Sequence, residues 1–231
     1  MKIRFVTITC EKYHDTRVKK IRETWGKSQD VLFLSDSNIG TDIIGYEHLA
    51  KGYENIWLKY SEFFKSYNDL SYDWYFFTDD DTFVNLKNIE ILLKNYDTNS
   101  PICIGHVGEL NPDGTDMDGN QTGFPLHTIH GNGTQLPIIY VSGGAGFILS
   151  KKSMELICDY IKKETNVPGS YNSDVTFGFW GRNAGVNIVD IKGFWWTNPT
   201  ELNHSLSEIE NSYTYHYVSE SMMDELNKVI L

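Results

Sequence analysis

Three consecutive carboxylates, Asp79-Asp80-Asp81, are the residues of this sequence best suited to chemistry. They directly follow an apolar, aromatic run over 74–78, which is typical of a buried central strand. Three neighbouring carboxylates repel one another unless a cation lies among them. A divalent cation bound by one or two of them, with substrate phosphates completing its shell, removes this repulsion. The triplet therefore indicates a metal and phosphate site, and a solvated acidic loop or a structural calcium site is the alternative.

Two further segments carry residues that often bind ligands. His216 stands in a strand-like aromatic segment, on the face opposite the tyrosines at 213, 215 and 217. Imidazole joins carboxylates in binding manganese-class metals, and a core histidine with satisfied hydrogen bonds is the alternative. The run Gly143-Gly144-Ala145-Gly146 allows the backbone to approach a ligand closely. A tight turn between two strands explains this run equally well.

Asp174 is a fourth carboxylate of interest, at the predicted start of a helix over 173–183. An aspartate at this position normally caps the helix or lies in its first turn. Its position alone therefore gives it no catalytic role.

An α/β architecture is predicted to position these residues. Strand-like runs at 3–9 and 31–34 flank a helical pattern over 15–25, and this alternation is typical of a partly parallel sheet. Aromatic residues at helical spacing predict an amphipathic helix over 53–67. Ligands of open α/β sheets bind beyond the carboxyl ends of the strands, where the acidic triplet is expected to lie.

The rest of the chain continues the same pattern. We expect helices over 86–95 and 151–164, strands over 138–141 and 186–191, a short strand over 213–218, and a final helix opened by a capping box of Ser221 and Asp224. Residues 107–137 are crowded with Gly, Asn, Asp, Thr and Pro and predict a long irregular loop excursion. Because no linker or repeat interrupts the pattern, we expect one domain over residues 1–231.

Composition excludes several classes of protein. The formal net charge of the 231 residues is -11, which argues against a nucleic-acid partner because phosphate recognition needs clustered Lys and Arg. The three cysteines are far apart and show no zinc-site spacing. Their odd number favours reduced, buried thiols, and one disulfide pair in an oxidising compartment is the alternative. The N-terminus is too short and polar for a signal peptide, and no apolar run reaches membrane-spanning length. The sequence thus predicts a soluble, cytoplasmic protein.

An ordered series of short blocks resembles the inverting β1,3-glycosyltransferases of family 31, nearest the core 1 β1,3-galactosyltransferase (T-synthase) branch, with the Fringe enzymes more distant. In chain order the blocks are Val6-Thr7, Thr24-Trp25, Leu32-Phe33-Leu34-Ser35, Trp57-Leu58-Lys59, Asp73-Trp74-Tyr75-Phe76, Asp79-Asp80-Asp81-Thr82-Phe83-Val84, Val141 to Phe147, Leu149-Ser150-Lys151, Ser173-Asp174-Val175 with Gly178, Gly185-Val186, and His216-Tyr217-Val218 with Met223 and Leu226. Together they span nearly the whole chain.

The resemblance implies a GT-A fold, a Rossmann-like mixed sheet flanked by helices, and transfer from a UDP-sugar donor with inversion. It implies that Asp81 and His216 ligate Mn²⁺, with Mg²⁺ as an alternative ion, together with the donor diphosphate. Asp79 would lie at the metal and its waters, and Asp79 and Asp80 would contact the ribose or sugar of the donor.

The resemblance also assigns roles away from the triplet. Asp174 aligns with the catalytic base, and Thr7 lies in the segment that would meet the uracil and ribose. The Gly143-Gly144 pair would approach the donor, and Trp195 and Trp196 are candidates for stacking on an acceptor sugar, with burial in the core as the alternative.

The sequence departs from the family pattern in four ways. Ser173 stands where the family usually has an acidic residue before the catalytic aspartate, and most cysteines of the animal enzymes are missing. The segment 194–211 is shorter than the acceptor region of the animal galactosyltransferases. The Golgi membrane anchor is also absent, so a Golgi-lumen location applies only if this chain is an anchor-less form of a eukaryotic enzyme.

The resemblance thus implies a metal-dependent, inverting hexosyltransferase. It would move a hexose, with galactose as the first candidate, from a UDP-sugar to a sugar or glycoside hydroxyl in a β1,3 linkage. Two other classes stay open. One is another metal-dependent enzyme acting on nucleotide sugars or phosphates, and the other is a catalytically inactive carbohydrate-binding member of the family.

Overall fold

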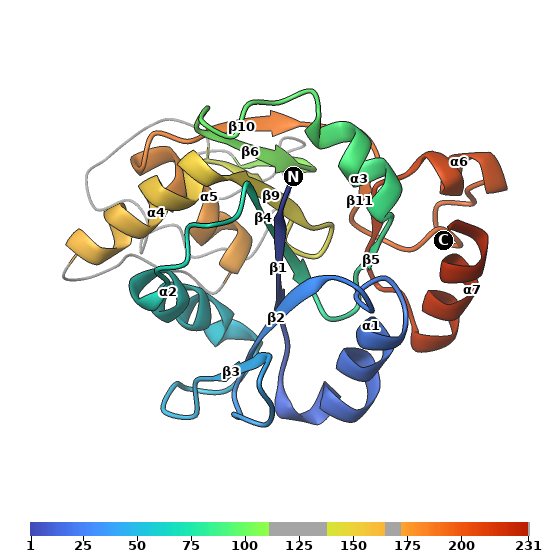
Figure 1. Ribbon diagram of the computed structural model, residues 1–231, viewed down its shortest axis with the longest axis horizontal. Coiled ribbons are helices and arrows are strands. Elements are labelled where there is room, and N and C mark those ends of the chain that lie inside the picture. Colours follow the sequence, from blue (N-terminus) through green and yellow to red (C-terminus); the bar gives the residue numbers. More distant parts are fainter. Residues whose placement is uncertain (111–137, 165–171, 231) are drawn as a thin grey trace.

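A mixed sheet forms the centre of the computed structural model, which describes residues 1–110, 138–164 and 172–230. Within these residues the sheet has seven strands in the order β10-β6-β9-β4-β1-β2-β3 (Figure 1). They are β1 (Ile3–Ile8), β2 (Asp30–Ser35), β3 (Ile43–Gly45), β4 (Trp74–Asp79), β6 (Ile102–Gly105), β9 (Phe147–Ser150) and β10 (Asn187–Asp190). The four strands β3, β2, β1 and β4 are parallel, and β9 is antiparallel to both of its neighbours. The predicted α/β class with a partly parallel sheet is confirmed.

Helices cover both faces of this sheet and give three layers (Figure 1). The helical segments of the described residues are η1 (Glu11–Tyr13), η2 (His14–Val18), α1 (Lys19–Glu23), η3 (Tyr53–Asn55), α2 (Ile56–Ser66), α3 (Leu86–Leu93), α4 (Lys151–Lys163), α5 (Ser173–Asn183), α6 (Leu206–Asn211) and α7 (Glu220–Ile230). One core contains α2, α4 and α5, and the other contains α1, α3 and α7. Because side chains alternate along a strand, Phe76 belongs to one core and Phe77 to the other.

A second small sheet links the acidic triplet to the C-terminal part of the chain. In the described residues it has three strands, β11 (Phe194–Trp195), β12 (Thr214–Tyr215) and β5 (Phe83–Val84), with β12 in the middle. Asp81 comes two residues before β5, and His216 directly follows β12. Pairing of β5 with β12 therefore brings two residues 135 positions apart in the chain to the same place.

The irregular excursion predicted over 107–137 begins later than expected. Residues Val107–Leu110 form strand β7, which pairs antiparallel with β8 (Ile138–Val141). Backbone pairing with β8 outweighs the loop-like composition of this stretch. The rest of the predicted excursion, 111–137, lies outside the described residues.

The strand predicted over 213–218 is much shorter in the structure. Only Thr214–Tyr215 pair as β12, and Tyr217 has a φ of 52°, in the left-handed region. A residue in that conformation cannot continue the alternation of a strand. The prediction that His216 lies opposite the tyrosines is therefore wrong for Tyr217, whose ring stacks on the imidazole.

Helix α7 and its cap lie two residues earlier than the predicted capping box places them. The side chain of Ser219 accepts a hydrogen bond from the backbone N–H of Met222 (3.2 Å), so Ser219 caps the helix. Ser221 instead lies in the first turn, and Asp224 forms an ion pair with Lys20 (2.9 Å).

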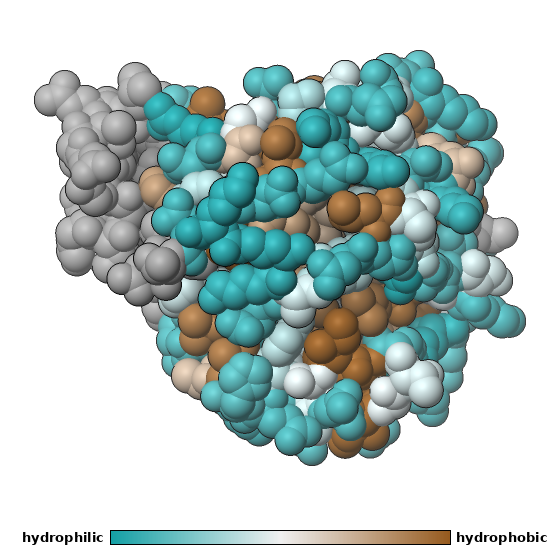
Figure 2. Space-filling model, turned by 60° about the vertical axis from the view of Figure 1, so that its left-hand side comes forward, coloured by the Kyte–Doolittle hydropathy of each residue, from teal (hydrophilic) through white to brown (hydrophobic). Residues whose placement is uncertain are grey.

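Hydrophilic side chains cover much of the face in Figure 2. On the face in Figure 2, hydrophobic side chains appear in groups between hydrophilic ones. All three cysteines are free, and Cys103 and Cys158 are buried, as the sequence predicts for reduced thiols. Among the helices that the structure describes, none combines the length and the apolar character needed to cross a bilayer.

Candidate functional site

The acidic triplet lies at the carboxyl edge of the parallel strands, as predicted. Asp79 is the last residue of β4 and lies opposite Ile8 at the end of β1. A turn follows, in which the N–H of Thr82 donates to the carbonyl of Asp79 (3.2 Å). Asp80 and Asp81 lie in this turn and are only 5% and 8% exposed. Carboxylates buried to this degree need cationic or hydrogen-bonding partners.

Backbone hydrogen bonds hold His216 beside the triplet. Its N–H donates to the carbonyl of Trp195 (3.1 Å), and the N–H of Val218 donates to the carbonyl of Asp81 (3.0 Å). The ring Nδ1 lies 3.2 Å from the carbonyl of Trp196. Because a carbonyl only accepts, Nδ1 carries the proton of this bond, and neutral imidazole then keeps a lone pair on Nε2.

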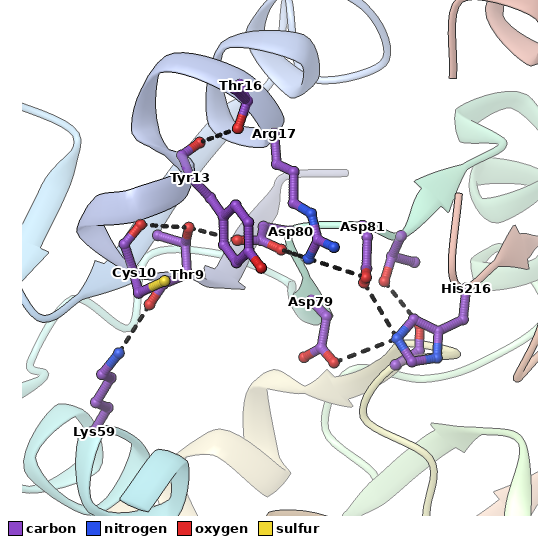
Figure 3. A network of polar contacts seen from close by, with 12 residues as sticks. Thr9, Cys10, Tyr13, Thr16, Arg17, Lys59, Asp79, Asp80, Asp81 and His216 are labelled. Carbon is purple, nitrogen blue, oxygen red and sulfur yellow. Dashed lines mark hydrogen bonds and ion pairs between the residues drawn. The ribbon is translucent and has the colours of Figure 1, made fainter. Parts of the chain in front are cut away.

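Nε2 of His216 faces two carboxylates. Burial lowers the pKa of this imidazole, but the hydrogen bond to Asp81 and the charges of Asp79 and Asp81 outweigh it and raise the pKa, so Nε2 carries a proton that a bound metal would replace. Nε2 of His216 lies 3.2 Å from Oδ1 of Asp81 and 3.6 Å from Oδ2 of Asp79 (Figure 3). One ligand atom from each of the three residues lies within 4.8 Å of the others, which is close enough to share one ion. The pKa of Asp79 is raised to about 7, chiefly by burial and also by the neighbouring carboxylates of Asp81 and Asp174. A divalent cation would relieve this repulsion, so the oxygen, oxygen and nitrogen donors fit a Mn²⁺-class metal.

The middle carboxylate, Asp80, faces away from this group. Its Oδ2 accepts from the hydroxyl of Thr9 (2.6 Å), and its Oδ1 accepts from Nη1 of Arg17 (2.8 Å) (Figure 3). The same Nη1 lies 3.1 Å from Oδ2 of Asp81, and the guanidinium stacks on the ring of Tyr13 at 4.2 Å. Asp81 therefore uses one oxygen toward Arg17 and the other toward His216.

Sequence reasoning missed Arg17 and Tyr13. Arg17 lies in the π-helical segment η2, and Tyr13, the last residue of η1, precedes it by four residues. Two signals were available: the aromatic and cationic pair at this spacing, and the need of the buried triplet for a cation. Neither signal identifies which cation of the chain meets the triplet.

A pocket of about 420 Å³ opens beside the triplet, between the carboxyl ends of β1, β2 and β4 and the start of α2. Lys59 of α2 is among its lining residues and is 7% exposed; its Nζ donates to the carbonyl of Thr9 (2.8 Å). Burial lowers the pKa of Lys59. The pocket is lined by Ile8, Thr9, Cys10, Tyr13, Arg17, Asp36, Gly52, Tyr53, Ile56, Lys59, Asp79, Asp80, Asp81, His216 and Tyr217.

The structure does not place Thr7 at this pocket. Thr7 is fully buried in β1, and its hydroxyl is hydrogen-bonded to that of Thr78 in β4 (2.9 Å). The side chain of Thr7 therefore has no free surface for a ligand, and the donor contact of its segment stays a prediction. Thr9, just past the end of β1, lines the pocket instead.

Asp174 lies in the first turn of α5 without capping it. The side chain of Asn172 is the cap and accepts from the N–H groups of Asp174 (2.9 Å) and Val175 (3.2 Å). The carboxylate of Asp174 is left to accept from the backbone N–H of Gly143, which lowers its pKa, but burial is the larger effect and raises it. The capping explanation for this aspartate therefore does not hold.

The run Gly143-Gly144-Ala145-Gly146 forms a turn between β8 and β9, the glycine turn, which lies between Asp174 and His216. A Cβ at Gly143 would lie 2.6 Å from Oδ1 of Asp174, and a Cβ at Gly144 would lie 2.1 Å from Cε1 of His216. Only glycine leaves room for both side chains. The turn between β8 and β9 is also fixed, because the carbonyl of Gly144 accepts from the hydroxyl of Thr82 (2.8 Å).

The two predicted acceptor tryptophans differ in their surroundings. Trp195 is partly buried; its indole N–H donates to Ser212 (2.8 Å), and its ring lies edge-on to that of His204. Trp196 is 53% exposed and uses its carbonyl to hold His216. The core alternative thus describes Trp195, and Trp196 presents its ring to solvent beside the site.

The sequence is similar to curated β-1,3-glucosyltransferases of Mus musculus and Homo sapiens. Each is 24% identical over 155 residues, which are 65% of this chain and 27% of the relative. The matched part thus spans about a quarter of the length of these relatives.

Solved structures show the fold. A glycosyltransferase involved in glycosylation of the major capsid of PBCV-1 matches over 100% of both chains, with a TM-score of 0.51 and 12% identity. The bifunctional glycosyltransferase WbbM matches over 99% of this chain and 49% of its own, with a TM-score of 0.52 and 10% identity. The chain has the GT-A glycosyltransferase fold.

A sequence profile described as Fringe-like matches residues 2–227, which include the triplet, the glycine turn, Asp174 and His216. The chain therefore belongs to the Fringe-like family.

Proposed function

We propose that the protein is a metal-dependent, inverting glycosyltransferase that moves a hexose from a UDP-sugar to a hydroxyl of a carbohydrate or glycoconjugate, in a β1,3 linkage. The carrying observation is the convergence of Asp79, Asp81 and His216 within 4.8 Å at the edge of the pocket. Membership of the Fringe-like family and the likeness to β-1,3-glucosyltransferases support the choice of reaction.

Asp79, Asp81 and His216 would hold the metal, with Mn²⁺ as the first candidate and Mg²⁺ as the alternative. The ion, when bound, supplies positive charge that stabilises the departing diphosphate. Arg17 adds a fixed cation beside the same carboxylates, since its Nη1 lies 3.1 Å from Asp81.

Asp174 would act as the base. It accepts the proton of the acceptor hydroxyl while the hydroxyl oxygen bonds to the anomeric carbon and the bond from that carbon to the UDP oxygen breaks. Attack from the face opposite UDP inverts the configuration. Burial raises the pKa of Asp174, which makes its carboxylate a better proton acceptor than an ordinary aspartate.

The pocket has the size and chemistry for the donor. Its volume of about 420 Å³ is in the usual range for small-molecule sites. Tyr13 and Tyr53 offer aromatic surface, and Lys59 and Arg17 offer positive charge. Asp80, whose oxygens are both bonded within the protein, would act on the donor through Arg17. The exposed ring of Trp196 is the proposed acceptor contact.

A screen of UDP-sugars against an acceptor panel with Mn²⁺ tests the reaction, with linkage and anomeric configuration read by NMR. We expect one β1,3-linked product with inverted configuration. Retention of configuration would contradict the mechanism, and release of phosphate or pyrophosphate without transfer would favour a phosphohydrolase or nucleotidyltransferase. Sugar binding without turnover would favour an inactive, carbohydrate-binding protein.

Calorimetry with Asp81→Ala tests the metal separately. We expect Mn²⁺-dependent UDP binding to be lost, because Asp81 faces His216 with one oxygen and Arg17 with the other. Asp42→Ala is the matched control, since Asp42 pairs with Arg22 on the surface. Unchanged affinity in Asp81→Ala would rule out this metal site.

A further inference from the structure

Tyr217 has a backbone conformation that tyrosine rarely adopts. Its φ is 52°, and among the described residues the other non-glycine residue with positive φ is Asn203 (φ 54°). Asparagine tolerates the left-handed region, whereas a bulky residue occupies it only where the surrounding structure enforces it. Strained backbone conformations of this kind are concentrated at functional sites.

Hydrogen bonds on both sides of Tyr217 enforce this conformation. The N–H of His216 donates to the carbonyl of Trp195 (3.1 Å), and the N–H of Val218 donates to the carbonyl of Asp81 (3.0 Å). The chain must therefore reverse at Tyr217 to connect the small sheet to the acidic turn.

Burial of its ring contributes little free energy to hold Tyr217 in this conformation. Its side chain is among the exposed large ones, at 59%, and it lines the pocket together with the triplet. Its ring contact is the imidazole of His216, with ring centres 3.8 Å apart and planes 23° apart. The strained position therefore serves to place a flat ring on the histidine.

His216 is restrained from other directions as well. The carbonyl of Trp196 holds Nδ1, and the backbone of Gly144 lies so close that no Cβ would fit. The stacked ring of Tyr217 lies against one face of the imidazole and opposes its rotation about the Cβ–Cγ bond from that side.

We propose that Tyr217 is a positioning residue, whose ring holds the imidazole of His216 with Nε2 directed at Asp79 and Asp81 for the metal ion. This inference rests on the metal site of the proposed function and not on the sugar that is transferred. Outer-shell residues that orient a histidine ligand typically change metal affinity about 10–100-fold.

Calorimetric titration of the full chain with Mn²⁺ tests the role, using Tyr217→Phe, Tyr217→Ala and Tyr217→Gly. We expect Tyr217→Phe to bind Mn²⁺ within about twofold of the wild type, since it keeps the ring. Tyr217→Ala and Tyr217→Gly should both bind about tenfold more weakly.

Melting in EDTA separates positioning from folding. Glycine is unstrained at this φ, so Tyr217→Gly should melt above Tyr217→Ala by about 2–4 °C while binding Mn²⁺ equally poorly. Asn203→Gly is the matched control, because it changes the other left-handed residue, and it should leave Mn²⁺ affinity unchanged.

Tyr217→Ala or Tyr217→Gly with wild-type Mn²⁺ affinity would overturn the proposal, as would a loss in Tyr217→Phe equal to that in Tyr217→Ala. A wild-type chain that binds no Mn²⁺ would overturn it together with the metal site. A chain that binds Mn²⁺ but transfers no sugar would contradict the proposed reaction alone, and the titrations would still decide the role of Tyr217.

Discussion

Replacing Gly144 with alanine tests whether the glycine turn makes room for His216. A Cβ there would lie 2.1, 2.2 and 2.4 Å from Cε1, Nδ1 and Nε2 of the imidazole. Non-bonded atoms usually lie about 3.5 Å apart, so the ring would have to move by more than about 1 Å. The turn itself is held, because the carbonyl of Gly144 accepts from Thr82 (2.8 Å) and the carbonyl of Ala145 accepts from Thr214 (2.5 Å).

A shift of this size is large on the scale of metal coordination. Nε2 of His216 lies 3.2 Å from Oδ1 of Asp81, and metal-ligand distances tolerate deviations of about 0.2 Å. We expect His216 to be lost as a ligand in Gly144→Ala. A misplacement of about 1 Å can lower a rate about 100-fold, and such a change in kcat/KM corresponds to about 2.7 kcal/mol.

Calorimetry with Mn²⁺ and steady-state kinetics measure the two effects. Gly181→Ala is the matched control, because a Cβ at this helical position would meet only Cβ of Val186 at 3.9 Å. It should leave Mn²⁺ affinity unchanged and stabilise the fold by about 0.5–1 kcal/mol. Wild-type Mn²⁺ affinity and turnover in Gly144→Ala would refute the claim that the turn positions His216.

Three further changes address the other parts of the site. Asp174→Asn should keep Mn²⁺ and UDP binding while lowering transfer at least about 100-fold, and near-normal turnover would exclude the base role. Because burial raises the pKa of Asp174, the wild-type rate should begin to fall at a higher pH than it would with an ordinary aspartate as the base. Arg17→Gln should lower the free energy of unfolding in urea by about 2 kcal/mol, because the buried Asp80 and Asp81 lose their cationic partner. Arg22→Gln, whose ion pair is exposed, should lower it by less than about 1 kcal/mol, and equal losses would contradict this reasoning. Trp196→Ala should raise the acceptor KM by up to about tenfold and leave donor hydrolysis unchanged. Leu206→Ala, which changes a similarly exposed side chain, should change neither, and an unchanged acceptor KM in Trp196→Ala would remove Trp196 from the acceptor site.

The sequence predicted well what depends on local pattern. The buried aromatic strand, the triplet at its end and the helix that begins with Ser173-Asp174 follow from hydrophobic periodicity and capping, and the structure has all three. The link from the triplet to His216 came from the family resemblance. The structure explains it by the pairing of β5 with β12, a contact that no local pattern encodes.

The sequence failed where a long-range contact overrides local preference. Arg17 lies in a helical segment 63 residues before Asp80, and only the folded β1 edge brings the two together. Tyr217 continues an alternating pattern in sequence but reverses the chain, because hydrogen bonds to Trp195 and Asp81 fix its neighbours. Thr7 matches a family block, but its side chain is fully buried and its hydroxyl is hydrogen-bonded to that of Thr78 on the neighbouring strand.

The alternation of the triplet explains how three adjacent carboxylates coexist. Asp79 faces His216, Asp80 faces Arg17, and Asp81 faces each with one oxygen, so the like charges are divided between a candidate metal site and an internal cation. The pocket is lined by four aspartates and two cations, Arg17 and Lys59; the aspartates are Asp36, Asp79, Asp80 and Asp81. When all four aspartates are ionised, two negative charges are left without a balancing cation. A diphosphate entering that field alone would be repelled. Under the proposed function, one divalent ion at the triplet would remove this excess. The carboxylates that repel a free diphosphate would then hold the ion that attracts it.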